Sequence, residues 1–102
     1  MNSAPERGYM TMPARILIYT SPFCMHCHAA LALLERKGVD VEQINVAMVP
    51  GARAEMVERS GRRSVPQIFL DGEHIGGNDE LRSLDIAGEL DRRLGLENVR
   101  AS

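Results

Sequence analysis

Apolar and polar residues follow two different periods along this chain. Short apolar runs and a stretch of strict alternation predict β-strands, while longer stretches with apolar residues three or four apart predict amphipathic helices. The predicted elements, in chain order, are a strand at 16–19, a helix at 24–37, a strand at 39–46, a helix at 50–60, strands at 67–70 and 73–75, and a final helix from Asn78.

Glycines and short polar motifs punctuate these elements. Gly38 follows the basic pair Arg36-Lys37 and predicts the end of the first helix. Asp71-Gly72 lies between two apolar runs and predicts a β-hairpin. We expect Asn78 to cap the last helix and Gly88 to divide it into two pieces.

Helical spacing also predicts which faces are buried. The helix at 50–60 should bury Ala52 and Met56 and carry a Glu55–Arg59 ion pair on its exposed side. The final helix should bury one apolar stripe, made of Leu81, Leu84, Ala87, Leu90 and Leu94.

The order of these elements, β-α-β-α-β-β-α, predicts an α/β fold. The first βαβ unit requires a parallel strand pair with a right-handed crossover, and the hairpin adds an antiparallel pair. We therefore expect a four-stranded mixed sheet flanked by helices on both faces. Functional sites in such sheets lie at the carboxyl ends of the strands.

Composition narrows the function classes. A chain of 102 residues suits one domain, which we place at 14–95 between a disordered tail at 1–13 and a C-terminal tail at 96–102. A net charge of −2 gives no reason to expect nucleic acid or an anionic membrane as partner. No stretch approaches the roughly 20 apolar residues of a membrane span. The N-terminal residues lack the pattern of a secretory signal, so we expect a reducing, cytoplasmic location.

The chain has only two cysteines, Cys24 and Cys27, and they lie at the start of the first predicted helix. At positions i and i+3 their side chains share one helix face, so the sulfurs can reach bonding distance. Cys24 would lie near free backbone N–H groups and the positive end of the helix dipole, which favour thiolate over thiol. This arrangement predicts a reversible dithiol with Cys24 as nucleophile.

Other roles for the cysteine motif are weaker. Cys24-Met25-His26-Cys27-His28 is a Cys-x-x-Cys-His haem-attachment string, but a c-type cytochrome requires export. A zinc site would need His26 and His28 as well, and adjacent helical residues diverge by roughly 100°. Purely structural cysteines would not explain a dithiol at a helix start, and we expect both histidines to be solvent-exposed.

Three motifs, in the same order along the chain as in that family, resemble those of the bacterial dithiol glutaredoxins. They are Cys24-x-x-Cys27, the segment Ser60 to Phe69 containing Ser64-Val65-Pro66, and the segment Ile75 to Leu81. The resemblance covers about residues 14–95 and implies a thioredoxin-like fold, a cis-proline at Pro66, and glutathione as the reductant of a thiol–disulfide oxidoreductase. It implies disulfide-containing or glutathionylated proteins as substrates.

The same resemblance implies glutathione contacts. Val65 and Pro66 would present a backbone edge to the cysteinyl unit, while Asn78 and Asp79 would bind the γ-glutamyl carboxylate and ammonium. Arg53 would reach the glycyl carboxylate, and Ser21 stands where the family has a lysine. Tyr19 is assigned only to packing.

The motif here, Cys-Met-His-Cys, lacks the family's usual proline after the first cysteine. Relatives without that proline can bridge a [2Fe–2S] cluster, which gives an alternative function: a cluster-binding or cluster-transfer dimer with Cys24 and glutathione as ligands. Otherwise we expect a monomer with no metal.

Overall fold

The computed structural model describes residues 15–96. The tails expected at 1–13 and 96–102 lie outside these residues, apart from Leu96. The helices and strands, in chain order, are β1 (Ile16–Thr20), α2 (Met25–Arg36), β2 (Val41–Asn45), α3 (Ala52–Ser60), β3 (Gln67–Leu70), β4 (Glu73–Gly76), α4 (Asn78–Ile86) and α5 (Glu89–Arg93). None of these helices is long and apolar enough to cross a membrane.

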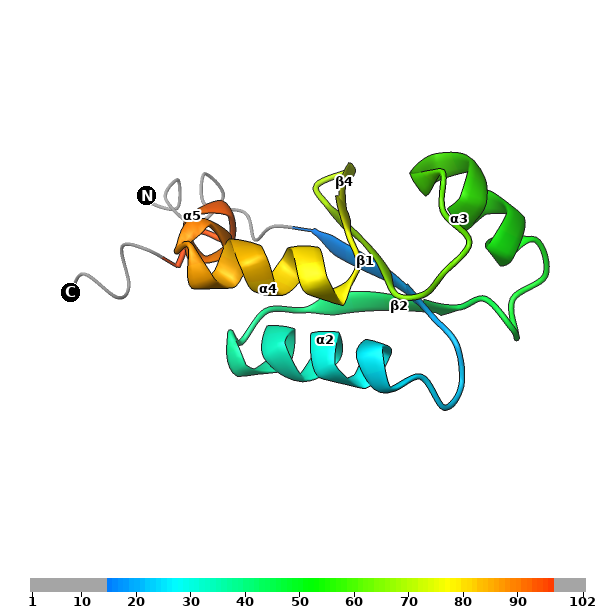
Figure 1. Cartoon of the computed structure of the whole chain (residues 1–102), viewed down its shortest axis with the longest axis horizontal. Coiled ribbons are helices and arrows are strands. Elements are labelled where there is room, and N and C mark those ends of the chain that lie inside the picture. Colours follow the sequence, from blue (N-terminus) through cyan, green and yellow to red (C-terminus); the bar gives the residue numbers. More distant parts are fainter. Residues whose placement is uncertain (1–14, 97–102) are drawn as a thin grey trace, which may run out of the picture.

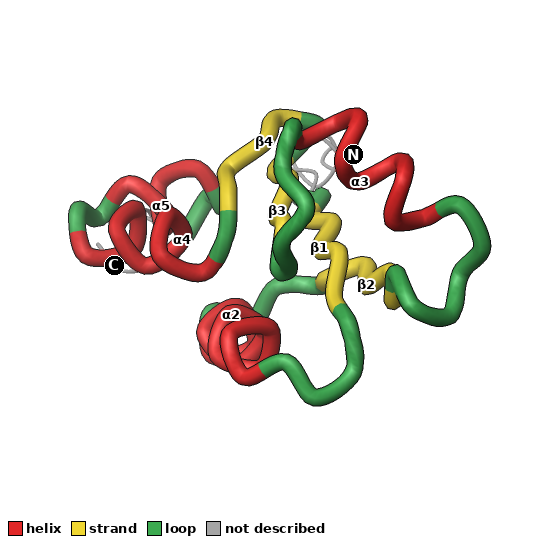
Figure 2. The backbone as a smooth tube through the Cα atoms, turned by 45° about the vertical axis from the view of Figure 1, so that its right-hand side comes forward, coloured by secondary structure: helices red, strands yellow, loops and turns green. Residues whose placement is uncertain are grey.

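The strands form one four-stranded sheet in the order β2-β1-β3-β4. β1 and β2 are parallel, whereas β3 is antiparallel to both β1 and β4. Helices α2, α4 and α5 lie on one face of the sheet and α3 lies on the other (Figure 1, Figure 2). The mixed sheet with helices on both faces, expected from the element order, is therefore confirmed.

Alternation along β1 supplies both cores. Ile16 and Ile18 pack under α2, α4 and α5, while Leu17 and Tyr19 face the smaller cluster beneath α3. The stripe predicted for the last helix is mostly correct, because Leu81, Leu90 and Leu94 are buried. Ala87 was placed wrongly: α4 ends one residue before it, so it no longer follows the helical period and is exposed.

Tertiary contacts replace one predicted local pair. Arg59 donates from Nη1 to the Tyr19 hydroxyl at 3.0 Å, and its guanidinium lies 4.3 Å from the centre of the Phe69 ring. The expected Glu55–Arg59 pair is therefore wrong. An ion pair on an exposed helix face contributes only a few tenths of a kcal/mol, so a half-buried hydrogen bond and a cation–π contact outweigh it.

Helix boundaries follow the glycines. Gly88, with φ of 78°, separates α4 from α5 as predicted, and Gly51, with φ of 80°, precedes α3, which begins at Ala52 rather than Pro50. The N-cap of α4 is Gly77, so Asn78 is the first residue of the helix and not its cap. The side chain of Glu80 accepts the Gly77 N–H at 2.6 Å and thereby closes the helix start.

Candidate active site at the start of helix α2

Cys24 caps the N-terminus of α2 with its sulfur. Its backbone is extended, with φ of −102° and ψ of 110°, and its Sγ accepts the N–H of Cys27 at 3.1 Å. No acidic residue occupies the first turn of this helix. The positive end of the helix dipole is therefore not opposed by a local carboxylate, which favours negative charge on the Cys24 sulfur.

Cys27 is more buried than Cys24, and this burial changes the acidity of the Cys27 thiol. It is only 3% exposed, whereas Cys24 is partly exposed. Burial, followed by the hydrogen bond between the two thiols, raises the pKa of Cys27 to about 12. The pair therefore has an accessible outer sulfur and an inner thiol that stays protonated at neutral pH.

A groove of about 220 Å³ lies beside this pair. Sγ of Cys24 contacts the Val65 carbonyl oxygen at 3.9 Å, which joins the nucleophile to one wall of the groove. Neither cysteine lines this groove, nor either of two larger hollows of about 460 and 420 Å³. Of the three, the groove is the one lined by Val65, which the Cys24 sulfur contacts. The groove is lined by His26 of α2, by Arg62, Ser64, Val65 and Pro66 of the loop before β3, and by Gly77, Asn78, Asp79 and Glu80 at the start of α4.

The loop before β3 and the start of α4 approach closely. The Val65–Pro66 peptide bond is cis, as the resemblance implies. A Cβ atom on Gly77 would lie 3.2 Å from the Pro66 carbonyl oxygen, so the close approach favours glycine at this position. The N-terminal end of α4 therefore borders the groove and contributes the positive end of its dipole.

Charged side chains complete this wall. The hydrogen bond from the Gly77 N–H is the main reason why the pKa of Glu80 is lowered, and Arg62 lies 3.5 Å from the same carboxylate oxygen. Asn78 is buried, and its Oδ1 has no hydrogen-bond partner among the described residues. Asp79 also lines the groove and is exposed to solvent.

A buried glutamine orients the Val65 edge. Gln67 is fully buried, and its Nε2 donates to the Ser64 carbonyl oxygen at 2.9 Å, while its Oε1 pairs with Nε2 of His74 at 2.7 Å. The Ser64 carbonyl and the Val65 N–H belong to one peptide plane and point in opposite directions. By holding the carbonyl, Gln67 also fixes the direction of the Val65 N–H.

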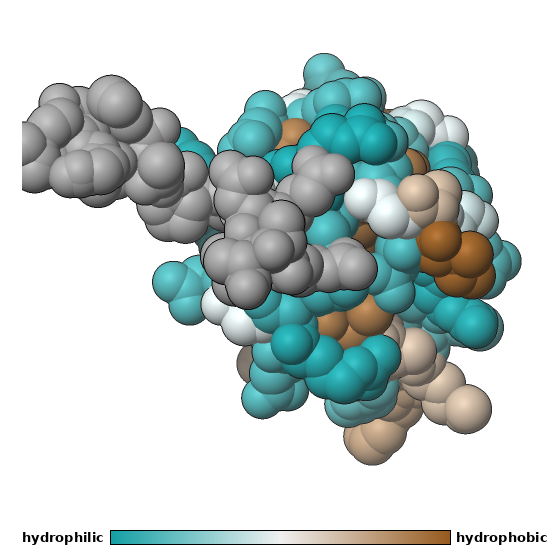
Figure 3. Space-filling view, turned by 90° about the vertical axis from the view of Figure 1, so that its left-hand side faces the viewer, coloured by the Kyte–Doolittle hydropathy of each residue, from teal (hydrophilic) through white to brown (hydrophobic). Residues whose placement is uncertain are grey.

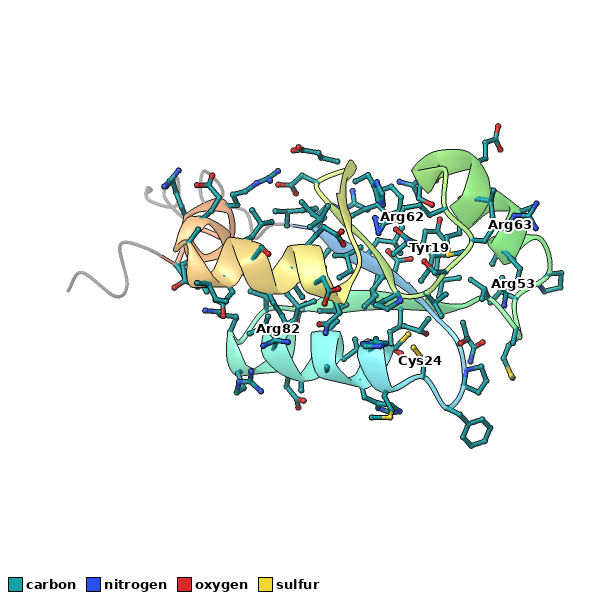
Figure 4. All side chains as sticks on the ribbon, in the orientation of Figure 1. Tyr19, Cys24, Arg53, Arg62, Arg63 and Arg82 are labelled. Atoms are coloured by element: carbon teal, nitrogen blue, oxygen red, sulfur yellow. The ribbon has the colours of Figure 1, made fainter. Side chains whose placement is uncertain are left out.

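Four of the predicted glutathione contacts, Val65, Pro66, Asn78 and Asp79, line the same groove. Ser21 and Arg53 do not line it. The backbone of Ser21 lies beside the Cys27 thiol and lowers its pKa, although by less than burial raises it. Arg53 is exposed on α3, at the same end of the molecule as Arg63 (Figure 4).

Some residues that line this site had no role predicted from the sequence. They are Arg62 and Ser64, in the loop before β3, and Gly77 and Glu80, at the start of α4. His26 and His28 are exposed, as expected, but His26 also lines the groove. The glycine followed three residues later by a glutamate was the one local signal available for the Gly77–Glu80 contact.

Comparison with known proteins agrees with this geometry. The glutaredoxin family model matches residues 16–75. This chain belongs to the glutaredoxin family. It is 49% identical to glutaredoxin 3 of Escherichia coli K12 over 78 residues, which cover 76% of this chain and 94% of that protein.

Solved glutaredoxin structures share the fold. The solution structure of a glutaredoxin from Brucella melitensis is 45% identical, with a TM-score of 0.72, and the match covers 83% of this chain and 92% of that one. A second structure, concerned with metal binding of glutaredoxins, is 46% identical, with a TM-score of 0.63, over 80% of this chain and 89% of that one. The thioredoxin-like architecture is therefore confirmed.

Family membership and the intact cysteine pair establish the reaction class. The chain is a glutathione-dependent thiol–disulfide oxidoreductase, and it acts with glutathione and protein disulfides.

Proposed function

We propose that Cys24 is the nucleophile of this glutaredoxin, that Cys27 is its resolving thiol, and that glutathione lies in the groove beside them. The observation that carries this proposal is the position of the Cys24 sulfur. It caps helix α2 at 3.1 Å from the Cys27 N–H and contacts Val65 at the edge of the groove.

The groove suits the parts of glutathione. Val65 offers a backbone edge whose N–H is oriented by Gln67, and such an edge can pair with the cysteinyl unit as an added strand would. The first N–H groups of α4, at Asn78 and Asp79, suit a carboxylate, while the Asp79 side chain suits an ammonium group. Arg62 adds a cation at the same wall. Contacts from Ser21 and Arg53 stay predictions, because neither residue lines the groove.

Two routes follow from the asymmetry of the thiols. With a glutathionylated protein, the Cys24 thiolate attacks the glutathione sulfur and expels the protein thiolate. A second glutathione then releases glutathione disulfide and restores the thiolate. With a protein disulfide, the Cys24 thiolate attacks one sulfur and expels the other as a thiolate, which leaves a mixed disulfide between Cys24 and the protein. Cys27 then loses its proton and attacks the Cys24 sulfur, and the protein sulfur bound there leaves as a thiolate. Two glutathione molecules finally reduce the Cys24–Cys27 disulfide and are released as glutathione disulfide.

Turnover of a glutathionylated substrate, coupled to glutathione reductase, tests the proposal. Cys27→Ser should retain most deglutathionylation and lose most reduction of an intramolecular protein disulfide. Loss of both reactions in a folded Cys27→Ser protein would show that one cysteine does not suffice.

The cluster alternative is limited by the number of ligands in one chain. Within residues 15–96 no group of three or more histidine, cysteine or acidic side chains could hold a metal ion. A [2Fe–2S] cluster would take Cys24 from each of two chains and a thiol from each of two glutathione molecules, and it would supply visible absorbance. Anaerobic reconstitution with iron, sulfide and glutathione tests this directly: a colourless monomer would remove the alternative.

Two further expectations belong to the same proposal. We expect the enzyme to work as a monomer and in the cytoplasm. There the glutathione pool lies close to the roughly −200 to −230 mV of glutaredoxins, so substrate supply can set the direction of the reaction.

A further inference from the structure

We propose that an uncharged, apolar rim beside Cys24 selects protein substrates whose target cysteine is flanked by apolar side chains. The rim consists of Phe23, Met25, Met48 and Val49. This inference rests on the proposed role of Cys24 and adds a substrate class to it.

The distribution of exposed apolar residues is uneven. Five large apolar side chains are exposed in residues 15–96: Phe23 (97%), Met48 (73%), Met25 (83%), Val49 (46%) and Ile86 (81%). All except Ile86 lie in the loops that follow β1 and β2 or at the start of α2. By contrast, the end of the molecule that carries α5 shows mostly hydrophilic residues, with hydrophobic ones in separate patches (Figure 3).

Sheet topology brings the two loops together. β1 and β2 are parallel, and Thr20 pairs with Asn45 at their carboxyl ends. The loops that follow the two strands therefore leave the sheet at the same edge. The Val46 N–H donates to the Thr20 carbonyl at 2.8 Å and extends this pairing past the strands. The loops that carry Phe23 and Met48 therefore start as neighbours, at the edge that also presents Cys24.

Phe23 has an unusual backbone conformation for a bulky residue. Its φ is 60°, in the left-handed region that such side chains rarely adopt, while its side chain is 97% exposed. Within residues 15–96, no packing around the Phe23 side chain compensates for that conformation. Backbone strain of this kind concentrates at binding and catalytic sites, and here it immediately precedes the nucleophile.

Disulfide formation at Cys24 determines which part of a protein substrate contacts this rim. Formation of a mixed disulfide brings the two Cα atoms to about 4.4–6.8 Å, so the residues beside the substrate cysteine must lie against the residues beside Cys24. These neighbours are uncharged: residues 21–25 and 47–50 contain no acidic or basic side chain. The groove, in contrast, carries Arg62, Asp79 and Glu80. Charged glutathione thus suits the groove, and apolar flanks of a protein substrate suit the rim.

The test compares two synthetic peptide dimers, each made of two identical single-cysteine peptides joined by one disulfide, with either leucine or serine on both sides of the cysteine. Attack of Cys24 on either sulfur of such a dimer releases one peptide thiol and forms the enzyme–peptide mixed disulfide that brings the flanking residues to the rim. Burial of about 60 Å² of apolar surface predicts that kcat/KM is about tenfold higher for the leucine peptide. Phe23→Asn tolerates the left-handed backbone and removes the apolar ring, so it should reduce this preference to about twofold. Ile86→Asn removes another highly exposed apolar side chain, on α4, and is the matched control, which should leave the preference unchanged.

A mixed disulfide of glutathione and 2-mercaptoethanol separates the two levels of the proposal, because it has no flanking residues. Equal kcat/KM for the leucine and serine peptides in the wild-type enzyme would overturn the inference. So would a Phe23→Asn effect that lowers turnover of the peptides and the small substrate alike, since the residue would then act on Cys24 itself. Absence of turnover of the small substrate by the wild-type enzyme would instead refute the proposed function, and the inference with it.

Discussion

The two ends of helix α2 are built in opposite ways. At the N-terminus a partly exposed sulfur caps the helix, and no carboxylate lies in the first turn. At the C-terminus Lys37 lies between two carboxylates of the last helical segments, with Nζ 2.6 Å from Asp85 and 2.8 Å from Asp91. The N-terminal end of α2 thus presents a reactive sulfur, while the C-terminal end is held to α4 and α5 by ion pairs.

The difference explains how a small domain combines a reactive group with a stable position for it. A lysine at the C-terminal end complements the helix dipole and joins α2 to α4 and α5. Its hydrogen bond to Asp85, and then that to Asp91, raise the pKa of Lys37, so the ammonium is charged at all ordinary pH values. The N-terminal end has no such anchor, because Cys24 must form and break bonds there.

The largest expected effect comes from removing the nucleophile. Cys24→Ser should reduce both deglutathionylation and protein disulfide reduction to the uncatalysed background, since serine is a very poor nucleophile towards disulfides. Coupled assays with glutathione reductase measure both reactions. Residual activity well above background would mean that another residue can replace Cys24.

The second effect concerns the acidity of the inner thiol. With a pKa of about 12, Cys27 should be thiolate in only about one molecule in ten thousand at pH 8. Brief treatment of the reduced enzyme with iodoacetamide at pH 8 should therefore modify Cys24 and spare Cys27, and modification of Cys27 should begin only when the pH approaches the raised value. Peptide mapping by mass spectrometry checks this. Comparable labelling of both thiols at pH 8 would contradict the asymmetry.

A smaller effect is expected from Gln67, which orients the Val65 backbone beside Cys24. Gln67→Met keeps the volume but leaves the Ser64 carbonyl without its donor, so the Val65 N–H loses its fixed direction. We expect KM for glutathione to rise about three- to tenfold, as for the loss of one hydrogen bond of about 1 kcal/mol. Iodoacetamide reactivity of Cys24 is the control and should stay unchanged. A variant with altered stability but unchanged KM would assign Gln67 to packing alone.

The smallest effect on activity is expected at the anchored end. Lys37→Met removes the ammonium between two carboxylates and should lower the free energy of unfolding by about 1–2 kcal/mol at pH 7, with little change in kcat/KM. Because the pKa of Lys37 is raised in the folded state, its contribution is complete below the unfolded value near 10.5 and is lost as pH rises through the folded value. Urea unfolding at pH 7 and above pH 10.5 measures both. A large loss of activity at unchanged stability would show that the two ends are not separate.

Local patterns predicted most of the fold. The periods of the apolar residues, the Asp71-Gly72 hairpin and the break at Gly88 were each encoded within a few residues, and each is confirmed. The predicted burial of Ala87 was wrong because a periodic stripe does not reveal where a helix ends. The predicted partner of Arg59 was wrong because its actual partners, Tyr19 and Phe69, are far away in the sequence.

The residues of the site likewise fall into those that the sequence predicts and those that it does not. Cys24 and Cys27 could be found from their spacing and their place at a helix start, whereas Val65, Pro66, Asn78 and Asp79 came only from the family resemblance. Arg62 and Gln67 could not be found, because their contacts join the loop before β3 to β4 and to the start of α4. Such contacts leave no period in the sequence.

The most direct test of the account is the covalent intermediate itself. Reduced Cys27→Ser enzyme is mixed with a glutathionylated peptide in the absence of free glutathione, and the intact protein is then weighed and mapped. The account predicts one glutathionyl group on Cys24, with one equivalent of peptide thiol released. An unmodified enzyme, or a peptide rather than glutathione attached to Cys24, would contradict it.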